Sequence, residues 1–219
     1  MKTLAIYGAG GMGREVLDLA REINEREKRW KDIVLLNDFR AKDSVNGAPM
    51  YTFAEFCAEW DPVCAEAVVA LGEPELRALL AQKLTEKGYS LATLLHPTVT
   101  IGTGAKIGAG TIICNRTFVS CNTQIGANVL IQPGSCVFHD VTVGDHSVIS
   151  AFVSLAGHVT IGARTYIGMS VPVREKVTIG SGSIVGMGAV VIKDIPDDVC
   201  VYGNPATVIR KNESKRVFR

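Results

Sequence analysis

The segment IGTGAKIGAGTIICNRTFVSCNTQIGANVL, residues 101–130, repeats one pattern every six residues. Each hexad opens on an aliphatic residue, and every sixth residue from Leu95 to Val191 is Leu, Ile or Val, without a slip. Glycine often follows the aliphatic residue directly, and the residue four places after it is mostly small or β-branched. Self-similarity at a fixed period over this length indicates a repeat architecture.

A chain that buries one aliphatic side chain in every six residues, with tight turns between, can wind into a triangular prism of short parallel strands. Three six-residue faces make one coil, so residues eighteen apart in the sequence stack on one another. The aliphatic residues then fill the interior, small residues fit the corners, and glycine relieves backbone strain at the turns. The repeat therefore predicts a left-handed parallel β-helix of nearly six coils with no long inserted loop.

The first 88 residues have a different pattern, in which apolar strands alternate with amphipathic helices. Strands are expected at 3–8, 32–38 and 65–72, and helices at 14–27 and 74–88. This alternation predicts a Rossmann-like α/β domain over 1–88, followed by the β-helix domain over 89–219. The residues after Val191 break the six-residue period and are expected to cap the open end of the prism.

Composition excludes several classes of function. The net charge of the 219 residues is +1 and no basic run stands out before the C-terminal end, which argues against nucleic-acid binding. No apolar run approaches the length of a membrane span. The six cysteines form no C-x-x-C pair, and we expect them to be reduced and mostly buried in a cytoplasmic protein.

The loop GAGGMG, Gly8 to Gly13, fits the G-x-G-x-x-G pattern between a strand and a helix. Its glycines let the backbone approach a pyrophosphate, which then lies against the helix N-terminus. Asp38 closes the second expected strand, where an acidic side chain can bind a ribose or sugar hydroxyl. Because the domain is too short for a full dinucleotide fold, we expect a nucleotide diphosphate that carries something other than nicotinamide.

His139 and Asp140 are adjacent and lie between the interior residues Val137 and Val143, so they occupy an outward-facing turn. An imidazole can act as a general base at neutral pH, and a neighbouring carboxylate orients the ring and stabilises the imidazolium. Eighteen residues on, Gly157 stacks on His139 and His158 stacks on Asp140. We hypothesise that His158 shares Asp140, either helping to hold it or drawing charge from the pair.

The chain resembles the bacterial sugar O-acyltransferases of the sialic-acid O-acetyltransferase type, which include N-acetyltransferases of nucleotide-linked 4-amino-sugars. The resemblance rests on an ordered set of segments: IYGAGGMGREV, LLNDF, LLHPTVTIG, the His139–Asp140 pair, LAGHVTIG and VYGNPATVIRK. It implies a homotrimer, with acetyl-CoA bound between neighbouring prisms and a nucleotide sugar held by the α/β domain. It implies no metal.

The resemblance also implies residue roles. His139 is the expected general base and Asp140 its partner. The expected acetyl-CoA contacts are Gly157, whose amide holds the acetyl carbonyl, Met169 and Met187. The expected substrate contacts are Gly10, Gly11, Met12, Asn37, Asp38 and Gln132. Many relatives carry other residues at the positions of Met12, Asn37, Gln132 and His158, which leaves the nucleotide and the sugar open.

Together with these residues, the resemblance implies acetyl-CoA-dependent N-acetylation of a nucleotide-linked amino-sugar, such as a 4-amino-4,6-dideoxy sugar, for O-antigen or other polysaccharide biosynthesis. The same machinery could acetylate a hydroxyl, as in sialic acid O-acetylation. A metal-dependent β-helix hydrase is a third class, which would need His139, His146 and His158 to converge. A scaffold role would leave the glycine loop and the His139–Asp140 pair unexplained.

Overall fold

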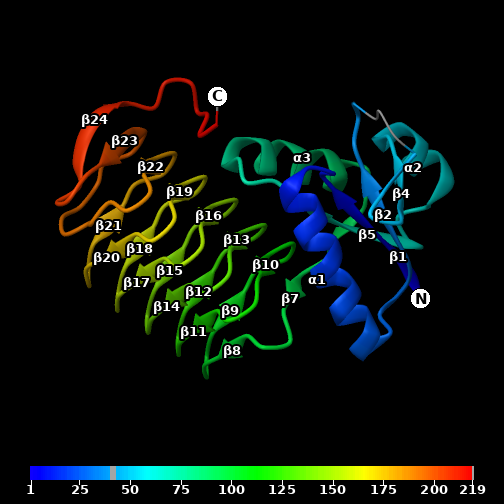
Figure 1. Ribbon diagram of the computed structural model, residues 1–219, viewed down its shortest axis with the longest axis horizontal. Coiled ribbons are helices and arrows are strands. Elements are labelled where there is room, and N and C mark those ends of the chain that lie inside the picture. The colour runs from blue at the N-terminus through cyan, green and yellow to red at the C-terminus, as the bar shows by residue number, and fades with distance from the viewer. Residues whose placement is uncertain (40–42, 219) are drawn as a thin grey trace.

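The computed structural model describes residues 1–39 and 43–218 and shows an α/β domain packed beside a long prism of short strands (Figure 1). Among the described residues, the α/β domain has a six-stranded sheet in the order β3-β4-β2-β1-β5-β6. Its strands are β1 (Lys2–Tyr7), β2 (Trp30–Leu36), β3 (Ser44–Val45), β4 (Ala48–Tyr51), β5 (Ala65–Val69) and β6 (Ser90–Leu91). Its helices are α1 (Gly11–Glu27), α2 (Phe53–Glu59) and α3 (Pro74–Glu86).

The strands and helices expected from the sequence are all present. Strand β1 lies in the middle of the sheet, and its run from Leu4 to Tyr7 is buried, as expected for a central parallel strand. Helix α1 buries one apolar stripe that includes Val16, Ala20 and Ile23. The sheet also takes in β6, which pairs with β5 and lies beyond residue 88.

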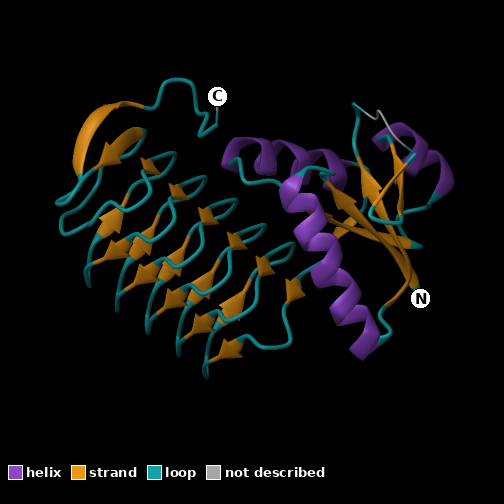
Figure 2. Cartoon of the chain, viewed as in Figure 1, coloured by secondary structure: helices purple, strands orange, loops and turns teal. Residues whose placement is uncertain are grey.

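The prism has three faces of parallel strands, as the six-residue repeat predicts (Figure 2). The first face contains β7 (Leu94–Leu95), β10 (Ile112–Ile113), β13 (Leu130–Ile131), β16 (Val148–Ile149), β19 (Tyr166–Ile167) and β22 (Ile184–Val185). The second contains β8 (Thr100–Ile101), β11 (Phe118–Val119), β14 (Cys136–Val137), β17 (Ser154–Leu155) and β20 (Pro172–Val173). The third contains β9 (Lys106–Ile107), β12 (Gln124–Ile125), β15 (Thr142–Val143), β18 (Thr160–Ile161) and β21 (Thr178–Ile179).

Residues eighteen apart pair across each face, for example Phe118 with Cys136 on β11 and β14. The repeated aliphatic residues form one continuous core from Ile113 to Val201. The first coil is less buried, because no earlier coil covers it: Leu95 and Ile107 are partly buried, and Ile101 is exposed. The fold is therefore a left-handed parallel β-helix joined to an α/β domain, and the predicted fold class is confirmed.

Turns join the three faces of the prism at its three corners. The first corner comprises the turns after the first-face strands, and the second and third corners follow the strands of the second and third faces.

Many turns place a non-glycine residue in the left-handed region, such as Asp140 with φ 59° and His158 with φ 60°. The repeated glycines have another purpose, because a Cβ at Gly144 would lie 2.5 Å from the amide nitrogen of Ala163 on the next coil. For the glycines that directly follow the aliphatic residue, the close approach of the next coil and not backbone strain requires glycine. Other prism glycines do relieve strain, since Gly104 and Gly134 have φ of 76° and 73°.

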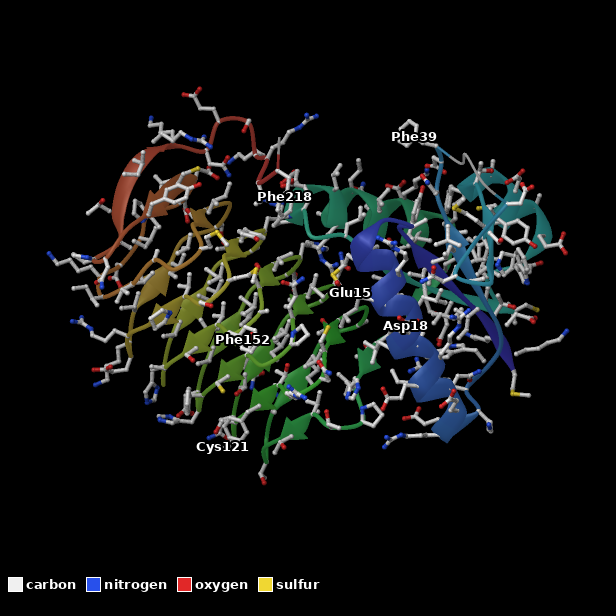
Figure 3. The ribbon with its side chains drawn as sticks, in the orientation of Figure 1. Glu15, Asp18, Phe39, Cys121, Phe152 and Phe218 are labelled. Atoms are coloured by element: carbon white, nitrogen blue, oxygen red, sulfur yellow. The ribbon has the colours of Figure 1, made fainter. Side chains whose placement is uncertain are left out.

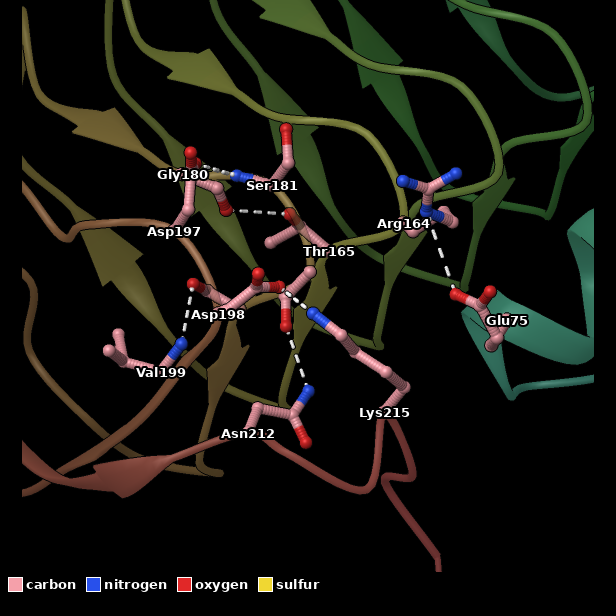
Figure 4. Close-up of polar contacts among 12 residues, drawn as sticks. Glu75, Arg164, Thr165, Gly180, Ser181, Asp197, Asp198, Val199, Asn212 and Lys215 are labelled. Carbon is pink, nitrogen blue, oxygen red and sulfur yellow. Dashed lines mark hydrogen bonds and ion pairs between the residues drawn. The ribbon is translucent and has the colours of Figure 1, made fainter.

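The C-terminal segment caps the prism, as expected. Strand β23 (Val199–Tyr202) pairs with β22, and β24 (Thr207–Lys211) returns antiparallel to β23. Beyond β24, the backbone N–H of Asn212 donates to the carbonyl of Asp198. The side-chain amide of Asn212 donates to the carbonyl of Gly182 (Figure 4). The tail then reaches the α/β domain, where the backbone N–H groups of Val217 and Phe218 donate to the carboxylate of Glu73.

The cysteines differ in part from expectation. All six are free, as predicted, but only Cys114 and Cys200 are buried, while Cys64 and Cys121 are exposed. None of the helices in the described ranges combines the length and the apolar character needed to cross a bilayer.

Candidate active site

His139 and Asp140 lie at the second corner, in the turn between β14 and β15. The Nδ1 atom of His139 is 2.8 Å from Oδ2 of Asp140, and Asn122 on the preceding coil donates from Nδ2 to Oδ1 at 3.3 Å. The hydrogen bond with His139, assisted by Asn122 and the nearby His158, holds the pKa of Asp140 below its usual range. An ionised Asp140 favours a proton on Nδ1 of His139, which leaves the Nε2 lone pair free to act as a base.

Gly157 lies directly against the imidazole of His139, as the stacking of residues eighteen apart predicts. A Cβ at this position would lie 2.6 Å from Nε2 of His139, so only glycine leaves room for the ring. Within the described part of the chain, the backbone N–H of Gly157 has no hydrogen-bond acceptor. The corner therefore presents a free imidazole nitrogen beside a free amide donor.

His158 joins the same cluster. Its Nε2 is 3.7 Å from Oδ2 of Asp140, and its ring meets that of His139 edge to face with centroids 5.2 Å apart. The three-histidine set of a hydrase is not assembled, because His146 lies at the third corner and contacts Nδ2 of Asn128 at 3.0 Å. His158 was identified from the sequence as a neighbour of Asp140, and the structure brings the two together.

The glycine loop begins α1, with Gly10 as the N-cap residue. A Cβ at Gly10 or Gly11 would meet open space, so the loop is accessible to a ligand. Gly13 has a structural role, since a Cβ there would collide with the carbonyl of Gly8. Met12 reaches the first corner of the prism, where Nε2 of Gln132 lies 3.6 Å from its sulfur.

The structure places Asp38 in a network that the sequence did not reveal. Its Oδ2 accepts hydrogen bonds from Tyr7 at 2.6 Å and Lys83 at 2.8 Å, and its Oδ1 accepts from the N–H of Phe53. Partial burial opposes ionisation, but the hydrogen bonds from Lys83 and Tyr7 lower the pKa of Asp38 overall. Burial and the bond to Asp38 raise the pKa of Tyr7 to about 12. Nearby, the side chain of Asn37 accepts from the N–H of Phe39.

A pocket of about 290 Å³ lies between α1 and the first corner. Figure 3 shows Glu15 and Asp18 on the stretch of α1 that faces the prism. Sequence reasoning did not single out this pocket, although its acidic residues recur on one side of the helix. Its lining residues are Glu15, Asp18, Leu19, Glu22, His96, Cys114, Asn115 and Pro133.

The candidate residues form two groups within one chain. The α/β domain covers the first face, because Met12 contacts the first corner and Arg77 of α3 contacts Asn128 at the third corner. The second corner, with His139, is the edge of the prism opposite that face. Figure 3 shows the separation through Cys121, which lies one coil before His139 on the second corner and far from Glu15 of α1.

The residues expected to contact acetyl-CoA are divided in the same way. Gly157 lies at the second corner, whereas Met169 and Met187 follow β19 and β22 at the first corner. Both methionine side chains are exposed. The structure therefore does not bring Gly157 together with either methionine within one chain.

Two family models match the sequence. The PglD N-terminal domain matches residues 3–84, and the bacterial transferase hexapeptide (six repeats) matches residues 122–157. The first match covers the glycine loop and the network around Asp38. The second includes His139, Asp140 and Gly157.

Solved structures match nearly the whole chain. The acetyltransferase domain of PglB from Neisseria gonorrhoeae, also solved with acetyl coenzyme A, is 31% identical with a TM-score of 0.89, and the match covers 95% of this chain and 100% of that one. PerB from Caulobacter crescentus, solved with CoA and GDP-perosamine, is 29% identical with a TM-score of 0.85 and coverages of 95% and 97%. WeeI from Acinetobacter baumannii, at 24% identity and a TM-score of 0.74, shares the fold.

These comparisons support the wider family but not the sialic-acid O-acetyltransferase type named by the sequence resemblance. The two relatives with the highest identities above are described as an acetyltransferase domain and a protein bound to CoA and an amino-sugar nucleotide. The matches to both domains, in the same order and over nearly the whole chain, establish the family. The chain belongs to the hexapeptide-repeat acetyltransferases that carry a PglD N-terminal domain, and it is an acyltransferase.

Proposed function

We propose that the protein transfers the acetyl group of acetyl-CoA to the amine of a nucleotide-linked amino-sugar, most simply a 4-amino-4,6-dideoxy sugar. The observation that carries the proposal is the His139–Asp140 pair packed on Gly157 at one corner of the prism. The PglB domain binds acetyl coenzyme A and PerB binds GDP-perosamine, which supports both substrate classes. The protein would act in the cytoplasm, in the assembly of polysaccharide or O-antigen.

The corner has the groups that direct acyl transfer requires. The amine of the sugar attacks the thioester carbonyl of acetyl-CoA, and Nε2 of His139 accepts the proton that the amine loses. The N–H of Gly157 donates to the oxyanion of the tetrahedral intermediate. When the intermediate collapses, the C–S bond breaks and the thiolate of CoA leaves, taking the proton from the imidazolium. Ionised Asp140 stabilises that imidazolium, and no step of this route needs a metal.

We propose that the active site forms between subunits of a homotrimer. Within one chain, the base lies on the edge of the prism opposite the face that the α/β domain covers. A neighbouring chain can bring its first corner, with Gln132, Met169 and Met187, to the second corner of this one. Exposed apolar side chains on and beside the second face support such an interface, since Phe118 and Phe138 contact each other at 6.1 Å between ring centroids. Light scattering of the purified protein should give three times the chain mass of 23.4 kDa.

We propose that the nucleotide sugar binds across the glycine loop and the first corner. The open backbone at Gly10 and Gly11 suits the pyrophosphate, which the N-terminus of α1 attracts. Met12 and Gln132 lie next to it, and the acidic pocket that contains Glu15 follows one helical turn later. The pocket carboxylates suit the hydroxyl and amino groups of a sugar better than a second phosphate. Asn37 and Asp38 would act at the nucleotide end, with Lys83 holding Asp38 in place.

The test of this function measures the release of CoA from acetyl-CoA in the presence of different acceptors. The acceptors are UDP-, dTDP- and GDP-linked amino-sugars that bear the amine at C3 or C4. We expect one nucleotide-linked amine to be acetylated efficiently, with the product identified by mass spectrometry. Matched sugars with a hydroxyl at the same carbon test the alternative of O-acetylation. Efficient turnover of those hydroxyl sugars alone, or of free sugars without a nucleotide, would contradict the proposal.

Gly157→Ala is expected to reduce kcat by at least about tenfold, because the new methyl group must displace the imidazole of His139. The substitution keeps the backbone N–H, so the loss measures the position of the base and not the loss of the oxyanion donor. Steady-state kinetics give kcat, and the melting temperature serves as the control for folding. Wild-type kcat in a folded Gly157→Ala protein would show that the ring does not work from the position seen here.

A further inference from the structure

We infer that His139, Asp140 and His158 form a binding site for a divalent transition metal such as Zn²⁺, and that the bound metal inhibits acetyl transfer. The inhibition rests on the proposed role of His139, whereas metal binding does not. Among the described residues, one ligand atom from each of these three side chains lies within 4.8 Å of the others. The two histidine side chains are about half exposed and the Asp140 side chain is a little over one third exposed, so an ion can reach them.

The separations of the ligand atoms suit a small ion. Zinc binds nitrogen and oxygen ligands at about 2.0–2.2 Å in tetrahedral sites, which places neighbouring ligand atoms roughly 3.3 Å apart. Oδ2 of Asp140 is 2.8 Å from Nδ1 of His139 and 3.7 Å from Nε2 of His158, so the observed spacings bracket that value. A nitrogen of each ring lies within 4.8 Å of the other, and rotation of the two exposed rings would bring all three atoms onto one ion.

The backbone holds the ligands in place. The N–H of His158 donates to the carbonyl of His139 at 3.1 Å, and the N–H of Asp140 donates to that of Cys121 on the preceding coil. The ring of His139 also packs on Gly157. Ligands fixed by a rigid scaffold lose little entropy on metal binding, which favours the site even at the protein surface.

The ligand set selects the kind of metal. Two imidazoles and one carboxylate suit Zn²⁺, Co²⁺ and Ni²⁺, whereas Mg²⁺ and Ca²⁺ prefer sets made of oxygen. Three protein ligands leave further coordination positions for water or for an amine from the substrate. The exposed Cys121, one coil before His139, is a second possible donor and needs its own control.

The metal inhibits through the tautomer of His139. Coordination uses the Nδ1 lone pair, so the single proton of the neutral imidazole must then sit on Nε2. A protonated Nε2 cannot accept the proton of the attacking amine. The ion also takes the carboxylate of Asp140 away from His139 and places positive charge where the imidazolium would form. Base catalysis is therefore lost while the fold is unchanged.

The test uses the full-length protein, freed of metal by a chelator and without CoA. Isothermal titration with ZnCl₂ should show one site per chain, and CoCl₂ should give a visible absorption band from a site with nitrogen ligands. His158→Asn should weaken Zn²⁺ binding at this site by about tenfold or more, because it removes one of three ligands. His146→Asn removes a histidine from a different corner, and Cys121→Ser removes the nearby thiol; both should retain the site.

The second readout is activity, measured by chromatography as the amount of acetylated product. For each variant, the rate with Zn²⁺ is compared with the rate of the same variant without metal. Zn²⁺ should inhibit the wild-type protein reversibly, and His158→Asn should need at least about tenfold more Zn²⁺ for the same inhibition. Equal Zn²⁺ affinity in the wild type and His158→Asn, or loss of binding only in Cys121→Ser, would overturn the inferred site. If Zn²⁺ binds tightly at this site but the wild-type rate with Zn²⁺ equals the rate without metal, metal binding is confirmed. The inferred inhibition and the proposed role of His139 are then refuted.

Discussion

Replacing His139 with alanine is expected to lower kcat/KM for acetyl transfer by about 10²–10⁴-fold, the usual contribution of a positioned general base. The ring lies on Gly157 and hydrogen-bonds to Asp140, so its Nε2 is the free imidazole nitrogen beside a free amide donor. Alanine leaves the Gly157 N–H and the rest of the corner in place. The residual rate should therefore remain above the uncatalysed rate, supported by binding and by the oxyanion donor.

Initial rates of CoA release at varied acceptor concentration give kcat and KM separately. We expect the loss to fall mainly on kcat, because alanine removes a proton acceptor and not a binding contact in the ground state. His146→Asn is the matched control, since His146 lies at the third corner and makes its side-chain contact with Asn128. A His139→Ala protein as active as this control would end the proposed mechanism.

Asp140→Asn should reduce kcat less than His139→Ala does. Asparagine can still accept a hydrogen bond from Nδ1 of His139, but it no longer supplies the negative charge that stabilises the imidazolium. The rate against pH, measured for both variants and the wild type, separates the two roles. A larger loss for Asp140→Asn than for His139→Ala would contradict the assignment of His139 as the base.

The prism could be predicted in detail because its rules are local. One buried aliphatic residue in six fixes the period, and the period fixes which residues stack, so the contact of His139 with Gly157 follows from sequence numbers alone. The same arithmetic predicts that His158 lies beside Asp140, as the structure shows at 3.7 Å. In a solenoid, residues that contact each other on successive coils are separated in the sequence by a whole number of repeats.

The α/β domain and its junction with the prism could not be read in this way. The hydrogen bonds from Tyr7 and Lys83 to Asp38 join residues 31 and 45 positions apart, and no periodic rule relates them. The acidic pocket also cannot be predicted from the sequence, because it forms only where α1 packs on the first corner. In the sequence, an acidic residue such as Glu15 is typical of a solvent-exposed helix face. The packing of two domains depends on their shapes and on buried polar contacts between residues far apart in the sequence. A short-range sequence pattern does not predict such contacts.

Arg77 is the buried polar contact at that junction. Its side chain is fully buried, and its guanidinium donates to the carbonyls of Val69 and Leu71 and to both the carbonyl and the side-chain oxygen of Asn128. Asn128 returns a hydrogen bond from Nδ2 to the carbonyl of Arg77. Burial lowers the pKa of Arg77 to about 9, which still leaves it charged at neutral pH. One side chain thus ties α3, the end of β5 and the third corner together.

A second link between α3 and the prism is much weaker. Arg164 lies 3.5 Å from Glu75, and both side chains are about half exposed (Figure 4). Exposed ion pairs of this kind contribute about 0–1 kcal/mol. The docking of the two domains therefore depends far more on Arg77 than on the visible surface ion pair.

Arg77→Met is expected to lower the free energy of unfolding by about 3–5 kcal/mol, because methionine fills much of the space but leaves the acceptors without donors. For a chain of this size that corresponds to a fall in melting temperature of roughly 10 °C. Thermal unfolding followed by circular dichroism measures the shift. Arg174→Met, at an exposed position on the prism, is the control and should change the melting temperature by no more than about 1–2 °C.

Arg77→Lys separates charge from hydrogen-bond geometry. Lysine keeps the positive charge, but its ammonium group cannot reproduce the planar fork that reaches Val69, Leu71 and Asn128 together. We expect most of the loss seen in Arg77→Met to remain, together with faster amide exchange in the turn that contains Asn128. Full stability in Arg77→Lys would mean that charge alone holds the junction, and full stability in Arg77→Met would mean that apolar packing across the first face is sufficient.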